Sequence, residues 1–153
     1  MVTKIRTYEK TSSQHSMKYF IASRWRNRAI LDPLVERIRA AGHDVYYFVE
    51  KTVTKHARDL NPEDYMREYE AIRNWREDPY CREIYEQDLK GLRESDTLLL
   101  VLPAGKSAHM EAGIAHGMGK PTILVGPVEE TESLYLAFDD WYPTVEIFIE
   151  SLE

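Results

Sequence analysis

The sequence predicts an α/β domain in which helices cover both faces of a parallel sheet. Thr97–Leu102 is a continuous apolar run, as expected of a strand buried on both faces. Similar short runs alternate with helical sequence along the chain. The chain has 153 residues, of which 43% are hydrophobic and 30% charged, a length and composition that suit one globular domain. Residues 1–16 lack periodicity and are interpreted as a flexible tail, which leaves residues 17–153 for the domain.

The first two strands are separated by a helix. Lys18–Ala22 is the first predicted strand, and Asp44–Val49 is the second. Between them, apolar residues at helical spacing indicate a helix that ends before Gly42, a residue suited to the position after a helix. Pro33 either begins this helix or kinks a longer one.

The middle of the chain is polar and then helical. Glu50–Leu60 is expected to be a mobile loop. Asn61-Pro62 then begins helical sequence with a capping residue, a proline in the first turn and acidic residues that favour the helix dipole. The helical sequence continues to about Glu94, with a break expected at Asp78-Pro79.

A further helix follows the central strand. Ser107 is the predicted N-cap. Apolar residues at i, i+4 and i+8 give this helix an apolar stripe, formed by Met110, Ile114 and Met118. Gly113 and Gly117 are expected to let this helix approach the sheet closely.

Three more elements complete the chain. Thr122–Val125 is a buried strand, Leu134–Phe138 is a candidate edge strand, and Thr144 is expected to cap a last helix. Five parallel strands with intervening helices predict a flavodoxin-like, Rossmann-like three-layer sandwich with strand order 2-1-3-4-5. In such a sheet, ligands bind at the carboxyl ends of the strands, where the strand order reverses.

This rule directs attention to two loops, Ser23–Arg28 after the first strand and Pro103–Ser107 after the third. Glu111 lies four residues after Ser107, so both side chains are expected on one side of the helix near its N-terminal end. Backbone N–H groups, a hydroxyl and an ammonium at this helix end can bind a phosphate, with arginines facing them across the crevice. The residues expected to bind substrate or its phosphate are Ser23, Arg24, Arg26, Gly105, Lys106 and Ser107.

Several short motifs extend over most of the segment from residue 19 to residue 125. They are Tyr19-Phe20-Ile21-Ala22-Ser23 with Arg24, Gly42-His43-Asp44-Val45, Asp88-Leu89 with Ser95-Asp96, Glu111-Ala112-Gly113, and Gly119-Lys120-Pro121. In their order and spacing the chain resembles the nucleoside 2-deoxyribosyltransferase-like superfamily, which includes N-glycosidases acting on nucleoside 5′-monophosphates.

The resemblance implies an enzyme in which Glu111 attacks the anomeric carbon, Asp88 is the acidic partner and Tyr19 lines the sugar pocket. It also implies a homodimer in which the neighbouring subunit helps to close the site. A carboxylate below the sugar can trap an oxocarbenium-like centre, while a second acid protonates the base or activates water. The helix dipole and Lys106 are expected to keep Glu111 ionised.

The resemblance and the loop chemistry together favour hydrolysis of a nucleoside 5′-monophosphate that releases free base. The transferases of the superfamily tend to have an acidic residue in the loop before the nucleophile, and this chain has none there. Transfer of deoxyribose between bases remains an alternative, as does a non-catalytic nucleotide-binding or sensing module. An enzyme that cleaves NAD is a third class, disfavoured because NAD needs room for a second nucleotide.

Composition narrows the remaining possibilities. A net charge of −6 argues against a general nucleic-acid-binding surface, and no apolar run approaches the ~20 residues of a membrane span. Cys81 is the single cysteine, which excludes an internal disulfide and a cysteine-based metal cluster. No secretory signal is recognisable. We therefore expect a cytoplasmic protein with a small-molecule nucleotide or nucleoside as partner and no metal or cofactor.

Overall fold

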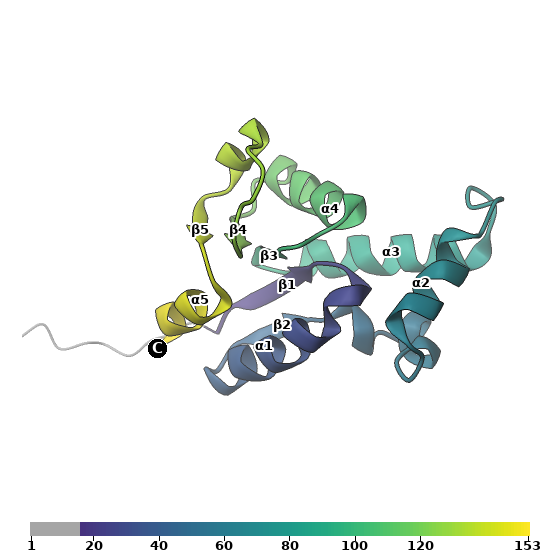
Figure 1. The fold of residues 1–153 in the computed structure, drawn as a ribbon, viewed down its shortest axis with the longest axis horizontal. Coiled ribbons are helices and arrows are strands. Elements are labelled where there is room, and N and C mark those ends of the chain that lie inside the picture. The colour runs from purple at the N-terminus through teal and green to yellow at the C-terminus, as the bar shows by residue number, and fades with distance from the viewer. Residues whose placement is uncertain (1–15) are drawn as a thin grey trace, which may run out of the picture.

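The computed structural model describes residues 16–153, whose core is a five-stranded parallel sheet with the order β2-β1-β3-β4-β5 (Figure 1). The strands are β1 (Lys18–Ala22), β2 (Asp44–Tyr46), β3 (Thr97–Val101), β4 (Thr122–Val125) and β5 (Asp140–Tyr142). All four strand pairs are parallel. The predicted fold class and strand order are confirmed. The predicted tail lies outside the described residues, apart from Ser16.

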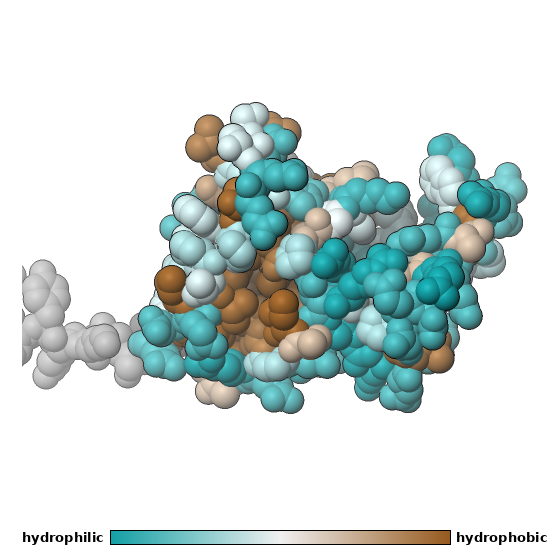
Figure 2. Space-filling view, viewed as in Figure 1, coloured by the Kyte–Doolittle hydropathy of each residue, from teal (hydrophilic) through white to brown (hydrophobic). Residues whose placement is uncertain are grey.

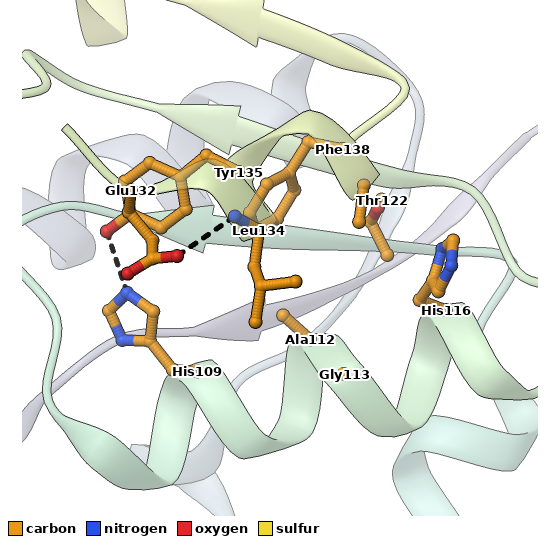
Figure 3. Close-up of a pocket in the computed structure, with 10 residues that line it drawn as sticks. His109, Ala112, Gly113, His116, Thr122, Glu132, Leu134, Tyr135 and Phe138 are labelled. Carbon is orange, nitrogen blue, oxygen red and sulfur yellow. Dashed lines mark hydrogen bonds between the residues drawn. The ribbon is translucent and has the colours of Figure 1, made fainter.

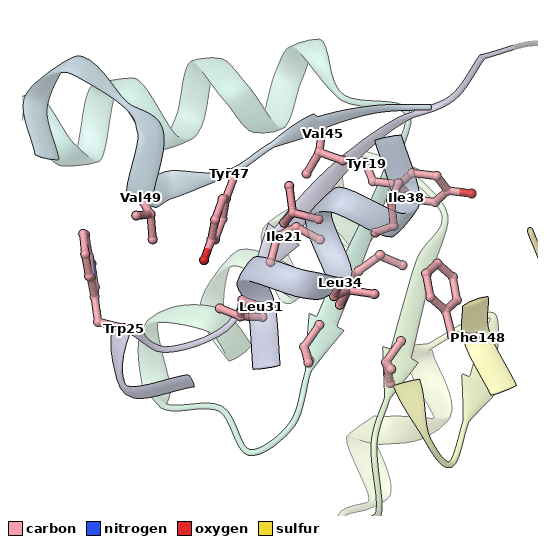
Figure 4. Packing of buried hydrophobic residues seen from close by; sticks show 14 of the residues in the cluster. Tyr19, Ile21, Trp25, Leu31, Leu34, Ile38, Val45, Tyr47, Val49 and Phe148 are labelled. Carbon is pink, nitrogen blue, oxygen red and sulfur yellow. The ribbon is translucent and has the colours of Figure 1, made fainter. Parts of the chain in front are cut away.

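Five α-helices accompany the sheet and form the two outer layers. They are α1 (Arg28–Ala40), α2 (Pro62–Glu70), α3 (Pro79–Glu94), α4 (Lys106–Gly117) and α5 (Val145–Leu152). Side chains of α1 and α5 pack against one face of the sheet, and those of α3 and α4 against the other. Alternate residues of β1 contact the two layers. Ile21 points towards α1 (Figure 4), whereas Phe20 packs with side chains of α3 and α4.

The pairing of the central strands determines where a crevice opens at the carboxyl-terminal edge of the sheet. In β3, Leu98–Val101 have no exposed surface, so this strand is buried on both faces. β1 pairs with β3 on one side and with β2 on the other. The chain therefore leaves β1 and β3 in opposite directions across the sheet, which opens the crevice expected at the reversal of strand order.

The helix ends follow the predicted capping residues. Asn61 accepts a hydrogen bond from the backbone N–H of Glu63 at 2.9 Å, and Thr144 accepts one from Ile147 at 3.1 Å. Gly42 follows α1 with a φ of +93°, a conformation that favours glycine. Pro33 lies inside α1, so the longer-helix alternative is the one the chain adopts. The predicted break before α3 is present, but α2 already ends at Glu70.

The segment from Asp44 to Leu60 differs from expectation in two ways. β2 ends at Tyr46 and not at Val49, because Phe48–Glu50 forms a 3₁₀-turn. The predicted mobile loop contains a 3₁₀-helix, Thr52–Ala57, that is anchored to the domain. Thr54 is buried and its hydroxyl donates to the backbone oxygen of Phe48 at 2.6 Å, while Ala57 has no exposed surface. The buried side chains of Thr54 and Ala57 attach this segment to the domain. The polar composition of the segment did not indicate that it would be attached.

The edge strand predicted at Leu134–Phe138 is wrong. Ser133–Ala137 forms a 3₁₀-helix, and the fifth strand follows at Asp140–Tyr142. Leu134 and Leu136 are 77% and 89% exposed, so these two leucines face away from the core, while Tyr135 and Phe138 pack against it. The side chain of Glu132 accepts the N–H of Leu134 at 2.9 Å and stabilises the turn conformation.

The orientation of α4 is also opposite to the prediction. The sheet is contacted by Ala108, Ala112 and Ala115, whereas Met110 is 67% exposed and Ile114 and Met118 are partly exposed. Gly113 and Gly117 point away from the sheet, since an added Cβ atom at either position would meet no atom within 4 Å. Alanines allow the helix to lie close to the sheet, so the larger apolar residues occupy its outer face.

The surface of the domain is uneven in character. Figure 2 shows hydrophobic residues gathered over the middle of the sheet and mostly hydrophilic residues over α2. Within residues 16–153, none of the helices combines the length and the apolar character that crossing a bilayer would require.

Candidate active site

A cavity of ≈ 400 Å³ opens at the carboxyl ends of β1 and β3. Its walls come from the two loops predicted to form the site and from α2, α3 and α4. All but one of the predicted site residues line it, namely Ser23, Arg24, Arg26, Asp88, Gly105, Lys106, Ser107 and Glu111. The fold therefore brings together residues that lie up to 88 positions apart, from Ser23 to Glu111.

The start of α4 is one side of this cavity. Gly105 is the N-cap and offers no side-chain acceptor, so the predicted capping role of Ser107 is wrong. The hydroxyl of Ser107 instead lies 3.5 Å from Oε1 of Glu111, on the same side of the helix. The first N–H groups of α4 receive no side-chain cap, and Lys106 stands beside them. A helix N-terminus of this kind attracts anions.

Two residues with carboxyl groups, Asp88 and Glu111, line this cavity. Glu111 and Asp88 are half-buried, and burial raises the pKa of both. The pKa of Asp88 rises to about 6. The pKa of Glu111 is raised well above its ordinary value, first by burial and then by the negative charge of Asp88, while the hydrogen bond from Ser107 acts in the opposite direction. Burial and the charge of Asp88 therefore act against the expected ionisation of Glu111, in opposition to the helix dipole.

Because the pKa of Asp88 is about 6 and that of Glu111 is also raised, the pair can retain a proton at a pH where ordinary carboxyls are ionised. One member is then a carboxylate and the other an acid. This is the combination that nucleophilic attack on a sugar carbon and protonation of a leaving group require. The arrangement suits chemistry at a cationic centre bound between the two groups.

Asp88 is held by groups that the sequence did not single out. The hydroxyl of Tyr46 donates to Oδ1 of Asp88 at 2.8 Å. The ammonium of Lys51 lies 4.2 Å from the centre of the Tyr46 ring, and its charge lowers the pKa of Asp88. No sequence signal marked Lys51, since it lies in the segment interpreted as a mobile loop.

A buried asparagine ties the two loops of the site together. Asn27 is 5% exposed, and its amide donates to the hydroxyl of Ser23 at 3.1 Å and to the backbone oxygen of Pro103. Its oxygen accepts from Nε of Arg24 at 3.2 Å. Ser23 in turn donates to the backbone oxygen of Val101 at 2.9 Å. Asn27 thus fixes the position of the Arg24 side chain at the cavity wall.

Arg26 lies at the cavity, but its guanidinium already forms ion pairs with two carboxylates. Its guanidinium contacts Oε1 of Glu63 at 2.6 Å and Oε1 of Glu70 at 3.2 Å, both on α2. The predicted phosphate contact is therefore opposed by two carboxylates that hold Arg26 against α2. Its role in the structure is to attach this helix to the loop after β1.

Tyr19 does not line the cavity, so its predicted place beside the sugar is wrong. Its side chain points to the opposite layer of the sheet, where its ring makes edge contacts with His43 and Phe148 (Figure 4). β1 alternates its side chains between the two layers, and Tyr19 falls on the α1 and α5 side. The tyrosines that line the cavity are Tyr65 and Tyr69 of α2, and Tyr46, from the neighbouring strand, contacts Asp88.

Two further cavities flank α4. One of ≈ 230 Å³ lies between α3 and α4 and shares Asp88, Ser107 and Glu111 with the cavity described above. The other, of ≈ 390 Å³, lies on the far side of α4 against the 3₁₀-helix Ser133–Ala137 (Figure 3). There the ring nitrogens of His109 contact the hydroxyl of Tyr135 at 2.8 Å and the backbone oxygen of Gly105 at 2.7 Å.

Among residues 16–153, no group of three or more His, Cys, Asp and Glu side chains is placed to hold a metal ion. At the cavity of ≈ 400 Å³, cationic side chains and the uncapped N–H groups of α4 suit the anionic part of an organic ligand. The carboxyl pair lies at the same cavity.

No protein-family model and no curated protein sequence matches the chain. Among solved structures, a 2-deoxyribosyltransferase from the psychrotolerant bacterium Bacillus psychrosaccharolyticus superposes with a TM-score of 0.57 and 17% identity, over 88% of this chain and 95% of that one. A CMP N-glycosidase from Clostridium botulinum gives 0.53 and 16%, over 88% and 96%.

A conserved protein from Enterococcus faecalis V583 gives a TM-score of 0.59 and 16% identity, over 90% of this chain and 97% of that one. At such identities the likeness concerns the fold. The chain therefore has the fold shared by a 2-deoxyribosyltransferase and a CMP N-glycosidase, which is the fold implied by its sequence motifs.

Proposed function

We propose that the protein cleaves the N-glycosidic bond of a nucleoside 5′-monophosphate and releases the free base. The observation that carries this proposal is the pair of Glu111 and Asp88 at one cavity with the N-terminus of α4. Two carboxyls that share a proton suit glycosidic cleavage, and the helix end with Arg24 and Lys106 suits a phosphate.

Each carboxyl has a role in the proposed reaction. An oxygen of Glu111 forms a bond to C1′ as the bond from C1′ to the base breaks, and Asp88 gives its proton to the departing base nitrogen. Water then attacks C1′, the bond to Glu111 breaks with its electron pair returning to the carboxylate, and the water proton goes to Asp88. The attack requires the shared proton to reside on Asp88 when substrate is bound.

The fold likeness to a CMP N-glycosidase supports hydrolysis of a nucleotide. The likeness to a 2-deoxyribosyltransferase supports the alternative, transfer of the sugar to a second base. One observation favours keeping this alternative: a second cavity, of ≈ 230 Å³, is also lined by Asp88 and Glu111 and offers space for a second base. Incubation with a nucleotide and a second, isotopically labelled base separates the two, because only transfer produces labelled nucleotide.

The decisive experiment is base release from a panel of ribo- and deoxyribonucleoside monophosphates, followed by chromatography. Glu111→Gln keeps the shape of the side chain and removes the nucleophile. It should bind nucleotide normally but release base at least ~1000-fold more slowly, about 4 kcal/mol of barrier. Glu83→Gln, at an exposed position of α3, is the matched control and should retain full activity.

A covalent adduct is the second readout. With a slow 2-fluoro-sugar substrate, mass spectrometry should locate a glycosyl group on Glu111. Base release by Glu111→Gln at the undiminished rate would exclude this residue as the nucleophile. Nucleotide binding without cleavage by either form would favour a binding or sensing module.

A further inference from the structure

The ring of Tyr46 is confined on several sides close to the carboxyl pair. It stacks on Phe20 with ring centres 4.7 Å apart and planes inclined by 4°. Lys51 lies over the ring at 4.2 Å from its centre. Against one edge lies Gly91, where an added Cβ atom would stand 2.1 Å from Cε2 of Tyr46. The backbone of α3 can approach the ring this closely only because residue 91 has no side chain.

The confined ring sends its hydroxyl to one oxygen of Asp88. The hydroxyl donates to Oδ1 at 2.8 Å. Burial raises the pKa of Tyr46, and the charge of Asp88 raises it further, so that the phenol keeps its proton and remains a donor. Among the described residues, Oδ2 of Asp88 takes part in no hydrogen bond, although its partner oxygen does. The two oxygens of this carboxyl are therefore not equivalent.

We propose that Tyr46 is a positioning residue of the site: by holding Oδ1 of Asp88, it assigns the acid proton to Oδ2. This inference rests on the proposed function, in which Asp88 protonates the departing base. A carboxyl free to rotate would present its proton in several directions, whereas one oxygen held by a fixed phenol leaves a single position for it.

The same contact affects the titration of Asp88. The hydrogen bond from Tyr46 stabilises the carboxylate and lowers the pKa of Asp88 against the effect of burial. Titratable groups approach Asp88 from each neighbouring element, namely Tyr46 on β2, Lys51 after the 3₁₀-turn, Tyr65 and Tyr69 on α2, and Glu111 on α4. Of these only Tyr46 bonds to Asp88 directly among the described residues.

Two substitutions test the inference from different directions. Tyr46→Phe keeps the stacked ring and removes the hydroxyl. Gly91→Ala keeps the hydroxyl and forces the ring to move, because the added Cβ atom cannot coexist with it. Both should lower kcat for base release by about 100-fold with little change in KM, as expected when an acid is displaced by about 1 Å.

Tyr47→Phe is the matched control. Tyr47 is the next residue, is equally buried and donates its hydroxyl to a different carboxyl, that of Asp32, in the opposite layer. This variant removes a buried hydrogen bond of the same kind, so it reports the cost of such a loss to the fold. Its pH profile and the titration of Asp88 should be those of the unsubstituted protein.

The experiment that decides is a ¹³C NMR titration of the side-chain carboxyls, recorded without nucleotide for the unsubstituted protein, Tyr46→Phe and Tyr47→Phe. In Tyr46→Phe the pKa of Asp88 should shift upward, and where base release is measurable the basic limb of its pH profile should move in the same direction. An unchanged Asp88 titration, or an equal shift in Tyr47→Phe, would overturn the assignment. Since the titration needs no turnover, it stands even if the protein releases no base.

Discussion

At the scale of single residues, Glu111 and Asp88 show how desolvation can prevail over nearby positive charge. Lys106 and the N-terminus of α4 lie at the same cavity, yet burial raises the pKa of both carboxyls, and the charge of Asp88 raises that of Glu111 further. A half-buried carboxyl pair of this kind lowers the stability of the folded state. It also serves acid–base catalysis, because it retains a proton at a pH where solvent-exposed carboxyls would have lost it.

Asp88→Asn should therefore alter stability in a pH-dependent manner. The pKa of Asp88 is about 6 in the folded protein and ~3.9 in the unfolded chain, so between these values the folded state holds the proton more tightly. The free energy of unfolding then falls as pH rises through this window. Relative to the unsubstituted protein, Asp88→Asn should gain on the order of 1–3 kcal/mol at pH 7.5 and little at pH 4.

Urea denaturation at the two pH values measures this difference. Asp59→Asn, at an exposed position, is the control and should show no pH-dependent gain. If Asp88→Asn changes the free energy of unfolding equally at both pH values, the Asp88 carboxyl titrates normally and the shared proton is excluded.

The proposed phosphate contacts predict an effect on substrate affinity. Arg24→Ala and Lys106→Ala should each raise KM for the nucleoside monophosphate, because each removes a charge-assisted contact worth roughly 1.5–3 kcal/mol. KM for the corresponding nucleoside should not change. Lys90→Ala, an exposed substitution on α3, controls for the loss of one positive charge. Wild-type KM values in both variants would place the phosphate elsewhere or remove it from the substrate.

At the scale of elements, α4 combines an alanine face on the sheet with a large apolar face directed outward. Among residues 16–153, Gly113 and Gly117 of this helix serve no close approach, since an added Cβ atom at either would meet nothing within 4 Å. Gly113→Ala should raise the free energy of unfolding by about 0.5–1 kcal/mol, since glycine in a helix interior is unfavourable relative to alanine and an added Cβ atom meets nothing.

Gly119→Ala is the contrasting control for this helix. Gly119 follows α4 with a φ of +76°, which an alanine adopts only with strain, so this substitution should destabilise the protein. Thermal or urea unfolding compares the two variants. A loss of stability in Gly113→Ala would contradict the view that this face of the helix has open space beside it.

At the scale of the whole molecule, the outer face of α4 is the surface we propose for a homodimer. Met110 and Ile114 lie on this face and also line the cavity of ≈ 230 Å³ that includes Glu111. A second copy placed here would cover exposed apolar surface and approach the carboxyl pair. The proposal thus agrees with the homodimer implied by the sequence resemblance.

Met110→Glu should prevent the proposed dimer from forming, because it places a charge in the proposed apolar contact. Size-exclusion chromatography with light scattering measures the mass, which is 17.9 kDa for one chain. Leu60→Glu, another exposed apolar position, should leave the mass unchanged. An unsubstituted protein that elutes as a monomer at high concentration would refute the dimer.

Much of the fold followed from local sequence. Apolar runs located β1, β3 and β4, while Asn61 and Thr144 marked helix starts because capping depends on neighbours in the chain. The strand order followed from the alternation of strands and helices. With the order known, the loops at the carboxyl edge were the place to expect a site, and the cavity lies there.

The tertiary structure alone decided which face of an element meets the sheet and which distant groups meet one another. In α4, helical spacing is equally consistent with the Met110 face or the Ala112 face lying on the sheet. The short distance between helix and sheet decides for the smaller alanine side chains. Tyr46 reaches Asp88 because Gly91 leaves room for its ring. Tyr46 and Asp88 are separated by 42 positions in the sequence, so local sequence does not reveal this contact. Such complementarity, and the desolvation that raises the pKa of Glu111, exist only once the chain has packed.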